Sequence, residues 1–367
     1  MLKAHSRLKL IAVTEMVKMR KLSYKCSSDC DVYVCEGALE KSLFNELLQG
    51  ANRVAIFYSN RVCSEFIGQI KSLLKSFNQD VFECEITDGE NAKTLENATK
   101  LANFLHSNSF NRNDLILNVG GGTVCDLGAF VASIYKRGIS YVNVPTTLLC
   151  AVDACIGGKT AIDVNGIKNL LGTIKQPKSV LIYTSIINDL PQEIFNGGIS
   201  EIVKYGVIKP EFGEFLIAYG DLNAIKQNIV EIIYRCLAIK AEFVTADEFD
   251  YGVRRQLNAG HTTAHAIEYA SEFELNHAQA VALGLVAEAR LARLLNLISN
   301  ERYARLKTLF ELLPKSEKYA LNLNKVIHAM QSDKKNVSDK ITFILPSETG
   351  VTEFYLRQNE LVNLLEI

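Results

Sequence analysis

Residues 22 to 183 alternate short apolar segments with amphipathic ones, and this alternation constrains the fold more than any other feature. Strands are predicted at Asp31 to Cys35, Arg53 to Tyr58, Val81 to Ile86, Asp114 to Val119, Tyr141 to Val144 and Val180 to Tyr183. Val62 to Phe77 and Ala92 to His106 have helical periodicity between them. Such alternation is typical of a mostly parallel sheet with helices on its faces. Sheets of this kind bind nucleotides at the carboxyl ends of their strands.

After Leu190 and Pro191 the pattern becomes almost entirely helical. Helices are predicted at Ile199 to Val207, Ile229 to Val244 and Ala278 to Ile298, with a short strand at Ile341 to Leu345 near the end. A chain of 367 residues is long for one core and fits two domains. We therefore predict an α/β domain over residues 22–187 and an all-α domain over residues 188–367.

Residues 1–21 are basic, with Glu15 as their single acid. We expect a poorly ordered extension or a frayed helix, with the organised chain beginning at Leu22. A basic arm, a transit peptide and an upstream start preceding Met19 are alternatives.

The composition excludes several classes of partner. The chain is 48% hydrophobic and 22% charged, with a formal net charge of −1, so its overall charge favours neither nucleic acid nor an anionic membrane. No apolar run is long enough to span a bilayer. Of the nine cysteines only Cys26, Cys30 and Cys35 cluster, without a common zinc spacing or a preceding secretion signal. We expect reduced thiols in a cytoplasmic protein.

Three of the six histidines lie between Arg254 and His277. His261 and His265 are four residues apart, so on a helix they share a face. His277 follows His261 by sixteen residues, which on one unbroken helix would rotate it by about 160°. We therefore predict a turn at Glu274 to Asn276, with Asn276 capping a new helix. Two helix ends would bring imidazoles together as a metal site with open positions; ordinary polar residues at helix ends are the alternative.

Glycine-rich turns supply candidate anion sites. Gly120, Gly121 and Gly122 end a predicted strand, and Thr123 to Tyr135 continues as a helix whose free N–H groups suit a phosphate. The sequence is not GxGxxG, so glycine serving only the turn geometry is an alternative. Lys159 follows Gly157 and Gly158, while Lys168 and Asn169 follow a second turn; they could bind anionic oxygens or be solvated.

Glu201 and Lys204 share a face of an otherwise apolar helix. A buried carboxylate there must be paired or bound to a metal, whereas an exposed one would form an ordinary surface pair.

The motifs occur in one order: GEN-x-K, GGG-x-x-x-D, Y-x-RG, PTTLL-x-x-VD, GGKTAID, KN, E-x-x-KYG and LN-x-GHT-x-x-HAIE. From about Leu22 to the C-terminus, this series resembles the 3-dehydroquinate synthase family of sugar phosphate cyclases. The resemblance implies a Rossmann-like NAD-binding α/β domain, a helical C-terminal domain, a divalent metal (usually Zn²⁺, with Co²⁺ possible) and a homodimer.

The resemblance also implies roles for individual residues. The metal ligands would be Glu201, His261 and His277. NAD would contact Glu90, Lys93, Gly121, Gly122, Asp126, Thr146, Thr147, Leu149, Asp153 and Lys168. The catalytic groups would be Lys159, Lys204, Lys240, Arg254, Asn258 and His265. These six would also bind the substrate phosphate and carboxylate, together with Asn169, Lys335 and, from the partner subunit, Arg137.

The implied reaction converts 3-deoxy-arabino-heptulosonate 7-phosphate to 3-dehydroquinate and phosphate in the shikimate pathway of aromatic amino acid biosynthesis. Bound NAD⁺ would take a hydride, phosphate would leave by elimination, and the hydride would return before an aldol step closes the ring. Three alternatives remain. One is a sister cyclase acting on sedoheptulose 7-phosphate or glucose 6-phosphate. The others are a glycerol dehydrogenase-like metal-dependent alcohol dehydrogenase and a catalytically silent regulatory or scaffold protein. Because Lys240 and Arg254 occupy the carboxylate positions, the sequence favours the heptulosonate.

The sequence departs from the family pattern at several positions. HAQAV replaces HGEAV, so Ala278 and Gln279 follow His277, and GHTTAHAIE replaces GHTFGHAIE through Thr263 and Ala264. Asp250 stands where Glu is usual. Ser59 lies where an acid would bind the adenosine ribose. None of these changes removes a predicted metal ligand.

Overall fold

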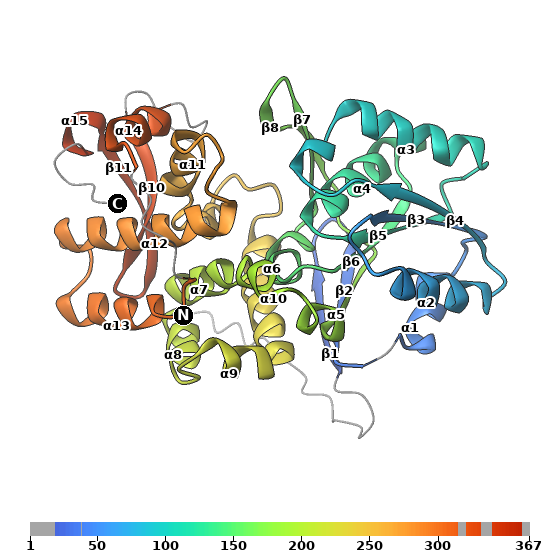
Figure 1. Ribbon diagram of the computed structural model, residues 1–367, viewed down its shortest axis with the longest axis horizontal. Coiled ribbons are helices and arrows are strands. Elements are labelled where there is room, and N and C mark those ends of the chain that lie inside the picture. The colour runs from blue at the N-terminus through green and yellow to red at the C-terminus, as the bar shows by residue number, and fades with distance from the viewer. Residues whose placement is uncertain (1–18, 38, 315–320, 332–339, 362–367) are drawn as a thin grey trace, which may run out of the picture.

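The computed structural model describes residues 19–37, 39–314, 321–331 and 340–361 (Figure 1). Its first part is a seven-stranded sheet in the order β1-β2-β9-β6-β5-β3-β4. The strands are β1 (Met19–Lys25), β2 (Asp29–Cys35), β3 (Arg53–Ser59), β4 (Asp80–Ile86), β5 (Leu115–Gly120), β6 (Ser140–Pro145) and β9 (Ser179–Tyr183). Only β1 runs antiparallel to its neighbour; the other pairs are parallel. The predicted strands and their parallel arrangement are confirmed.

Alternate residues of each strand point to opposite faces of this sheet. Val54 and Ile56 of β3 pack against α1 (Lys41–Leu47) and α2 (Ser64–Lys75). Ala55 and Phe57 pack against α3 (Leu95–Ser107) and α4 (Gly122–Ile134) on the other face. All six residues of β5 are buried, as expected for a parallel strand covered on both sides.

The second part is helical, and α7 lies at its junction with the sheet domain (Figure 1). Its helices are α5 (Thr184–Asn188), α6 (Gln192–Asn196), α7 (Ile199–Ile208), α8 (Pro210–Ile217), α9 (Leu222–Gln227), α10 (Ile229–Ala246), α11 (His261–Ala270), α12 (His277–Leu294), α13 (Asn300–Phe310), α14 (Leu323–Gln331) and α15 (Gln358–Leu361). The predicted boundary between residues 187 and 188 falls inside α5. No helix in the described ranges has the length and apolar character needed to cross a bilayer.

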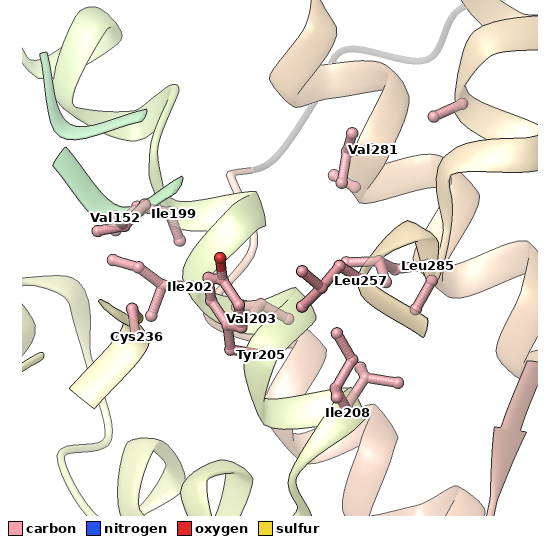
Figure 2. Close-up of a cluster of buried hydrophobic side chains, with 14 of the residues drawn as sticks. Val152, Ile199, Ile202, Val203, Tyr205, Ile208, Cys236, Leu257, Val281 and Leu285 are labelled. Atoms are coloured by element: carbon pink, nitrogen blue, oxygen red, sulfur yellow. The ribbon is translucent and has the colours of Figure 1, made fainter. Parts of the chain in front are cut away.

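Every residue of α7 is buried. Figure 2 shows its side chains lying between Val152 and Cys236 on one side and Leu257, Val281 and Leu285 on the other. The same core cluster includes residues of β2 and β9, so the sheet and the helices share one core. Polar side chains on α7 are therefore held away from water, at the junction of the two parts.

The structure adds elements that the sequence pattern did not predict. β1 begins at Met19, before the expected start at Leu22. β7 (Lys159–Val164) and β8 (Ile167–Ile174) form an antiparallel hairpin that projects beside the sheet (Figure 1). In the helical part, β10 (Lys340–Ser347) pairs with β11 (Gly350–Arg357), although only Ile341 to Leu345 was predicted as a strand. This hairpin is an addition to the predicted all-α domain.

Candidate active site

Two histidines and a glutamate converge from three helices. Glu201 lies on α7, while His261 and His277 are the first residues of α11 and α12. Glu201 Oε1 is 3.5 Å from His261 Nε2 and 3.3 Å from His277 Nε2. One ligand atom from each side chain lies within 4.8 Å of the other two. The structure thus brings the predicted metal ligands together.

The turn between α11 and α12 positions His277, as the histidine spacing predicted. Asn276 is the N-cap of α12: its side chain accepts from Gln279 N at 3.0 Å, and Gln279 Oε1 accepts from Asn276 N at 3.0 Å. This reciprocal capping box fixes the first turn of the helix. Gln279, a departure from the family pattern, therefore has a structural role.

The start of α11 is held by α12. The carboxylate of Glu288, which is buried, accepts from Gly260 N at 2.7 Å and from Thr263 N at 3.1 Å. Helix N-termini leave such N–H groups without intrahelical partners, and a carboxylate satisfies them well. Glu288 thus fixes His261 relative to His277.

The electrostatics of the cluster suit a cation. Burial acts to raise the pKa of Glu201, but Lys204 and His261 outweigh it and hold the pKa well below its ordinary value. Burial lowers the pKa of His261 to about 4, so this imidazole is neutral near pH 7. Burial alone would lower the pKa of His277, but the carboxylates of Glu201 and Glu268 raise it to about 9.

Two imidazoles and one carboxylate form a donor set that fits a catalytic zinc ion with an open position. His261 Nδ1 faces the Ala259 carbonyl oxygen at 3.1 Å, which leaves Nε2 directed toward Glu201. Lys204 Nζ lies 2.5 Å from Glu201 Oε2, so Oε1 is the oxygen that faces both histidines. The residues present therefore fit a divalent metal.

A cationic cluster adjoins the histidines. Lys204 Nζ is 3.6 Å from Asp153 Oδ1, and Lys240 Nζ donates to the Asp153 carbonyl at 2.7 Å and lies 3.2 Å from Oδ1. Arg254 donates to the carbonyl oxygens of Gly157, at 2.8 Å, and Glu248, at 2.5 Å. Lys204, Lys240 and Arg254 are all buried. Burial lowers the pKa of Lys240, and Arg254 and Lys204 act in the same direction while Asp153 opposes them.

The glycine turn lies where the sequence placed it, at the carboxyl end of β5. Thr146 N donates to Gly120 O at 2.9 Å, so the ends of β5 and β6 are adjacent. A Cβ on Gly121 would lie 3.2 Å from Thr147 Cγ2. α4 begins at Gly122 without a side-chain cap, and the first N–H groups of a helix have no intrahelical partner, which suits a phosphate.

A second polar group surrounds buried Lys93 near this turn. Lys93 Nζ lies 3.0 Å from Asp126 Oδ2 and 3.3 Å from Glu90 Oε1, and it donates to Asn169 Oδ1 at 2.5 Å. Burial acts to lower the pKa of Lys93, but Asp126 and Glu90 raise it overall. Lys93 thus contacts two other residues predicted to bind NAD, Glu90 and Asp126, and also Asn169, which was predicted to bind substrate. Leu149 is the N-cap of the short π-helical segment Cys150–Ala154 that carries Asp153.

The remaining predicted residues are more peripheral. Lys159, which is 55% exposed, pairs with Asp250 at 2.5 Å. His265 is exposed, and its ring centroid lies 5.6 Å from that of His261. Asn258 donates to Arg255 O at 2.9 Å. Arg137 is exposed and follows α4, while Lys335 lies outside the described residues.

Other departures from the family pattern also have local contacts. The carbonyl of Ala278 accepts from Ser200 Oγ at 2.8 Å, and Ala264 is fully buried. Ser59 Oγ donates to Asp88 Oδ1 at 3.4 Å, which places a carboxylate beside the position where the family's acid is missing.

Sequence reasoning missed Glu268 and Glu288. Glu268 belongs to the HAIE motif, and its Oε1 lies 3.5 Å from His277 Nδ1. Glu288 is a lone acid on the buried stripe of α12. The rule applied to Glu201, that a carboxylate on an apolar stripe needs a partner, would have indicated that Glu288 has a buried partner, although not that the partner is the start of α11.

Two sequence families match the chain in succession. The 3-dehydroquinate synthase N-terminal family matches residues 83–197, and the 3-dehydroquinate synthase C-terminal family matches residues 198–336. The chain is 32% identical over 351 residues to the 3-dehydroquinate synthase of Clostridium tetani, covering 93% of this chain and 92% of that protein.

Solved structures share the fold. The 2-deoxy-scyllo-inosose synthase complexed with carbaglucose-6-phosphate, NAD⁺ and Co²⁺ has a TM-score of 0.81 at 21% identity, covering 94% of this chain and 99% of that one. The 2-epi-5-epi-valiolone synthase of Streptomyces hygroscopicus, with NAD⁺ and Zn²⁺ bound, has a TM-score of 0.78 at 22% identity, covering 97% and 98%. At these identities the likeness is one of fold.

Proposed function

Because the chain belongs to the 3-dehydroquinate synthase family, we propose that it converts 3-deoxy-arabino-heptulosonate 7-phosphate to 3-dehydroquinate and phosphate. It would act as a phosphate-eliminating lyase of the shikimate pathway that depends on NAD and a divalent metal, Zn²⁺ or Co²⁺. The homodimer and the cytoplasmic location expected from the sequence belong to the same proposal.

The observation that carries the proposal is the buried cationic cluster beside the metal ligands. Lys204, Lys240 and Arg254 approach the segment 153–157 from three different elements. These three cations face two carboxylates, Asp153 and Glu201, so the cluster has a net charge of +1 before the charge of a divalent metal is added. This charge suits a ligand that carries both a carboxylate and a phosphate.

Each group has a role in this proposal. When bound, NAD would accept and return a hydride, and the metal held by Glu201, His261 and His277 would acidify a substrate hydroxyl. Arg254 and Lys240 bind the carboxylate; the contacts of Arg254 with neutral carbonyls leave its charge available to an anion. Lys204 orients Glu201 and, from a buried position, stabilises enolate charge.

The phosphate end would lie toward the exposed residues. Lys159, Asn169, Asn258 and His265 bind or orient it in this proposal, with Lys335 and the partner subunit's Arg137. The NAD contacts are assigned to the glycine turn and its surroundings: Glu90, Lys93, Gly121, Gly122, Asp126, Thr146, Thr147, Leu149, Asp153 and Lys168.

The test incubates the purified protein with NAD⁺ and Zn²⁺ and follows phosphate release and NADH absorbance together. We expect phosphate from the heptulosonate with no net NADH, and no phosphate from sedoheptulose 7-phosphate or glucose 6-phosphate. Turnover of sedoheptulose 7-phosphate alone would instead identify a sister cyclase. NADH formed in proportion to product would identify an alcohol dehydrogenase.

A variant tests the carboxylate site. Lys240→Met should lower kcat/KM for the heptulosonate by about a hundredfold, equivalent to roughly 3 kcal/mol, because a buried ionic contact with substrate is lost. Lys71→Met, which removes an ion pair between α2 and β4 (Lys71 to Glu83, 2.8 Å), is the control and should leave kcat/KM unchanged. Equal values for both variants would contradict the assignment of Lys240.

A further inference from the structure

The two histidines of the metal cluster are held in the same way. In each ring, Nε2 faces Glu201 Oε1, and Nδ1 faces an oxygen on the opposite side. For His261 this oxygen is the Ala259 carbonyl at 3.1 Å; for His277 it is Glu268 Oε1 at 3.5 Å. An acceptor at Nδ1 fixes the tautomer and the ring plane, so that the Nε2 lone pair points at a metal.

Glu268 is well placed to act on His277. It lies on α11, the helix that His261 begins, and its side chain is 8% exposed. Lys168 Nζ of β8 lies 3.6 Å from Glu268 Oε1 and 4.6 Å from the centroid of the Phe273 ring. The carboxylate is thus held between the β7–β8 hairpin of the sheet domain and a histidine of the helical domain.

We propose that Glu268 is a positioning residue that orients His277 for metal binding, and that Lys168 holds its carboxylate in place. This inference rests on the proposed metal-dependent function and names a residue that acts through a ligand. The contact also joins the hairpin to the metal centre across the two parts of the chain. Losing the carboxylate or carbonyl that accepts from the second ring nitrogen of a metal-binding histidine weakens metal affinity by about 10- to 100-fold.

The test measures Co²⁺ binding to the full chain after removal of metal with a chelator, by competition titration and by the visible absorption of the bound ion. Glu268→Ala should bind Co²⁺ about 10- to 100-fold more weakly, with an altered absorption spectrum, because the His277 ring loses its acceptor. Glu268→Gln should restore part of the affinity, since its amide oxygen still accepts from Nδ1–H. Lys168→Met should weaken binding less than Glu268→Ala.

A matched control separates orientation from a general effect of charge. Glu272 follows α11, is 82% exposed and lies 3.7 Å from Lys325, so Glu272→Gln and Glu272→Ala should bind Co²⁺ as the unaltered protein does. Thermal unfolding of every metal-free variant shows whether it folds. If Glu268→Ala does not fold, Glu268→Gln decides, with a loss of affinity and an altered spectrum expected.

The outcomes distinguish this inference from the proposed metal site. Co²⁺ affinity and spectrum unchanged in both Glu268 variants would overturn the role of Glu268, even if the unaltered protein binds Co²⁺ and His261→Ala does not. Unchanged affinity in Lys168→Met would overturn the Lys168 step. If His261→Ala binds Co²⁺ as well as the unaltered protein does, the metal site itself is wrong, and the inference falls with it.

Discussion

Gly284 lets the two histidine-bearing helices come into backbone contact. A Cβ at this position of α12 would lie 2.2 Å from the Gly260 carbonyl oxygen and 3.0 Å from Ala264 N. Neither atom can move without shifting the start of α11, which Glu288 also holds. The distance between His261 and His277 therefore depends on the absence of one methyl group.

Gly284→Ala should destabilise the protein by roughly 1–3 kcal/mol, because an added methyl forces packed backbone apart. Gly68→Ala, on the exposed face of α2 with open space around it, should instead stabilise by about 0.5–1 kcal/mol through helix propensity. Urea unfolding of the metal-free variants gives both values. A stabilising effect at Gly284 would show that α11 and α12 can separate freely.

At the scale of elements, the first turn of α12 determines where His277 lies. Asn276 satisfies Gln279 N, one of the N–H groups that a helix start leaves unpaired. Asn276→Ala should lower stability by about 1 kcal/mol and weaken Co²⁺ binding, because the turn that carries His277 would fray. Ser299→Ala removes the N-cap of α13, where Ser299 Oγ accepts from Arg302 N at 3.1 Å.

Ser299→Ala is the control for Asn276→Ala. It should lower stability by a similar amount and leave Co²⁺ affinity unchanged, because α13 carries no predicted metal ligand. The comparison is made by urea unfolding and Co²⁺ titration of both variants. Equal Co²⁺ affinities in the two variants would mean that the cap stabilises α12 without positioning its first residue.

Two of the strands that sequence periodicity missed, β1 and β8, are largely exposed. β8 is exposed along most of its length, including Ile167, Leu170 and Leu171, so no buried face imposes a pattern on it. β1 is an edge strand with basic residues, which natural sheets place on edges to prevent further pairing. The central strands were predictable because burial on both faces selects continuous apolar runs.

Some residues of the candidate site could be predicted from the sequence and others could not. The histidine spacing indicated the turn and its cap, whereas the resemblance was needed to add the distant Glu201. Glu268 and Glu288 gave no spacing signal, because each acts on a residue brought near only by the packing of α11 against α12 or by the turn between them. Such partners depend on tertiary geometry that one sequence does not display.

At the scale of the whole molecule, Glu248 joins three segments where the sheet meets the helices. Its carboxylate accepts from Ser27 N at 2.8 Å and Ser27 Oγ at 2.7 Å, in the turn between β1 and β2. It also accepts from Gln176 Nε2 at 2.9 Å, ahead of β9. The carbonyl of Glu248 accepts from Arg254, so this junction borders the proposed carboxylate site.

The junction should make stability depend on pH. Burial acts to raise the pKa of Glu248, but hydrogen bonds from Ser27 and Gln176 outweigh it and lower the pKa from 4.5. A carboxylate whose pKa is depressed on folding contributes stability that is present above its unfolded pKa. That contribution is lost as the pH falls through the folded value, because the unfolded chain takes up the proton first.

Glu248→Gln should therefore lower stability by about 1 kcal/mol near neutral pH, because the amide offers one acceptor oxygen and turns its NH₂ toward a donor. The difference from the unaltered protein should shrink as the pH falls below 4.5. Urea unfolding across this range measures it. Glu242→Gln is the control: Glu242 lies on α10, ahead of Glu248, is 63% exposed and pairs with Lys209 at the surface, so this substitution should lower stability by a smaller amount. If Glu248→Gln differs from the unaltered protein by the same unfolding free energy at every pH, the negative charge of Glu248 does not stabilise this junction, and only its packing does.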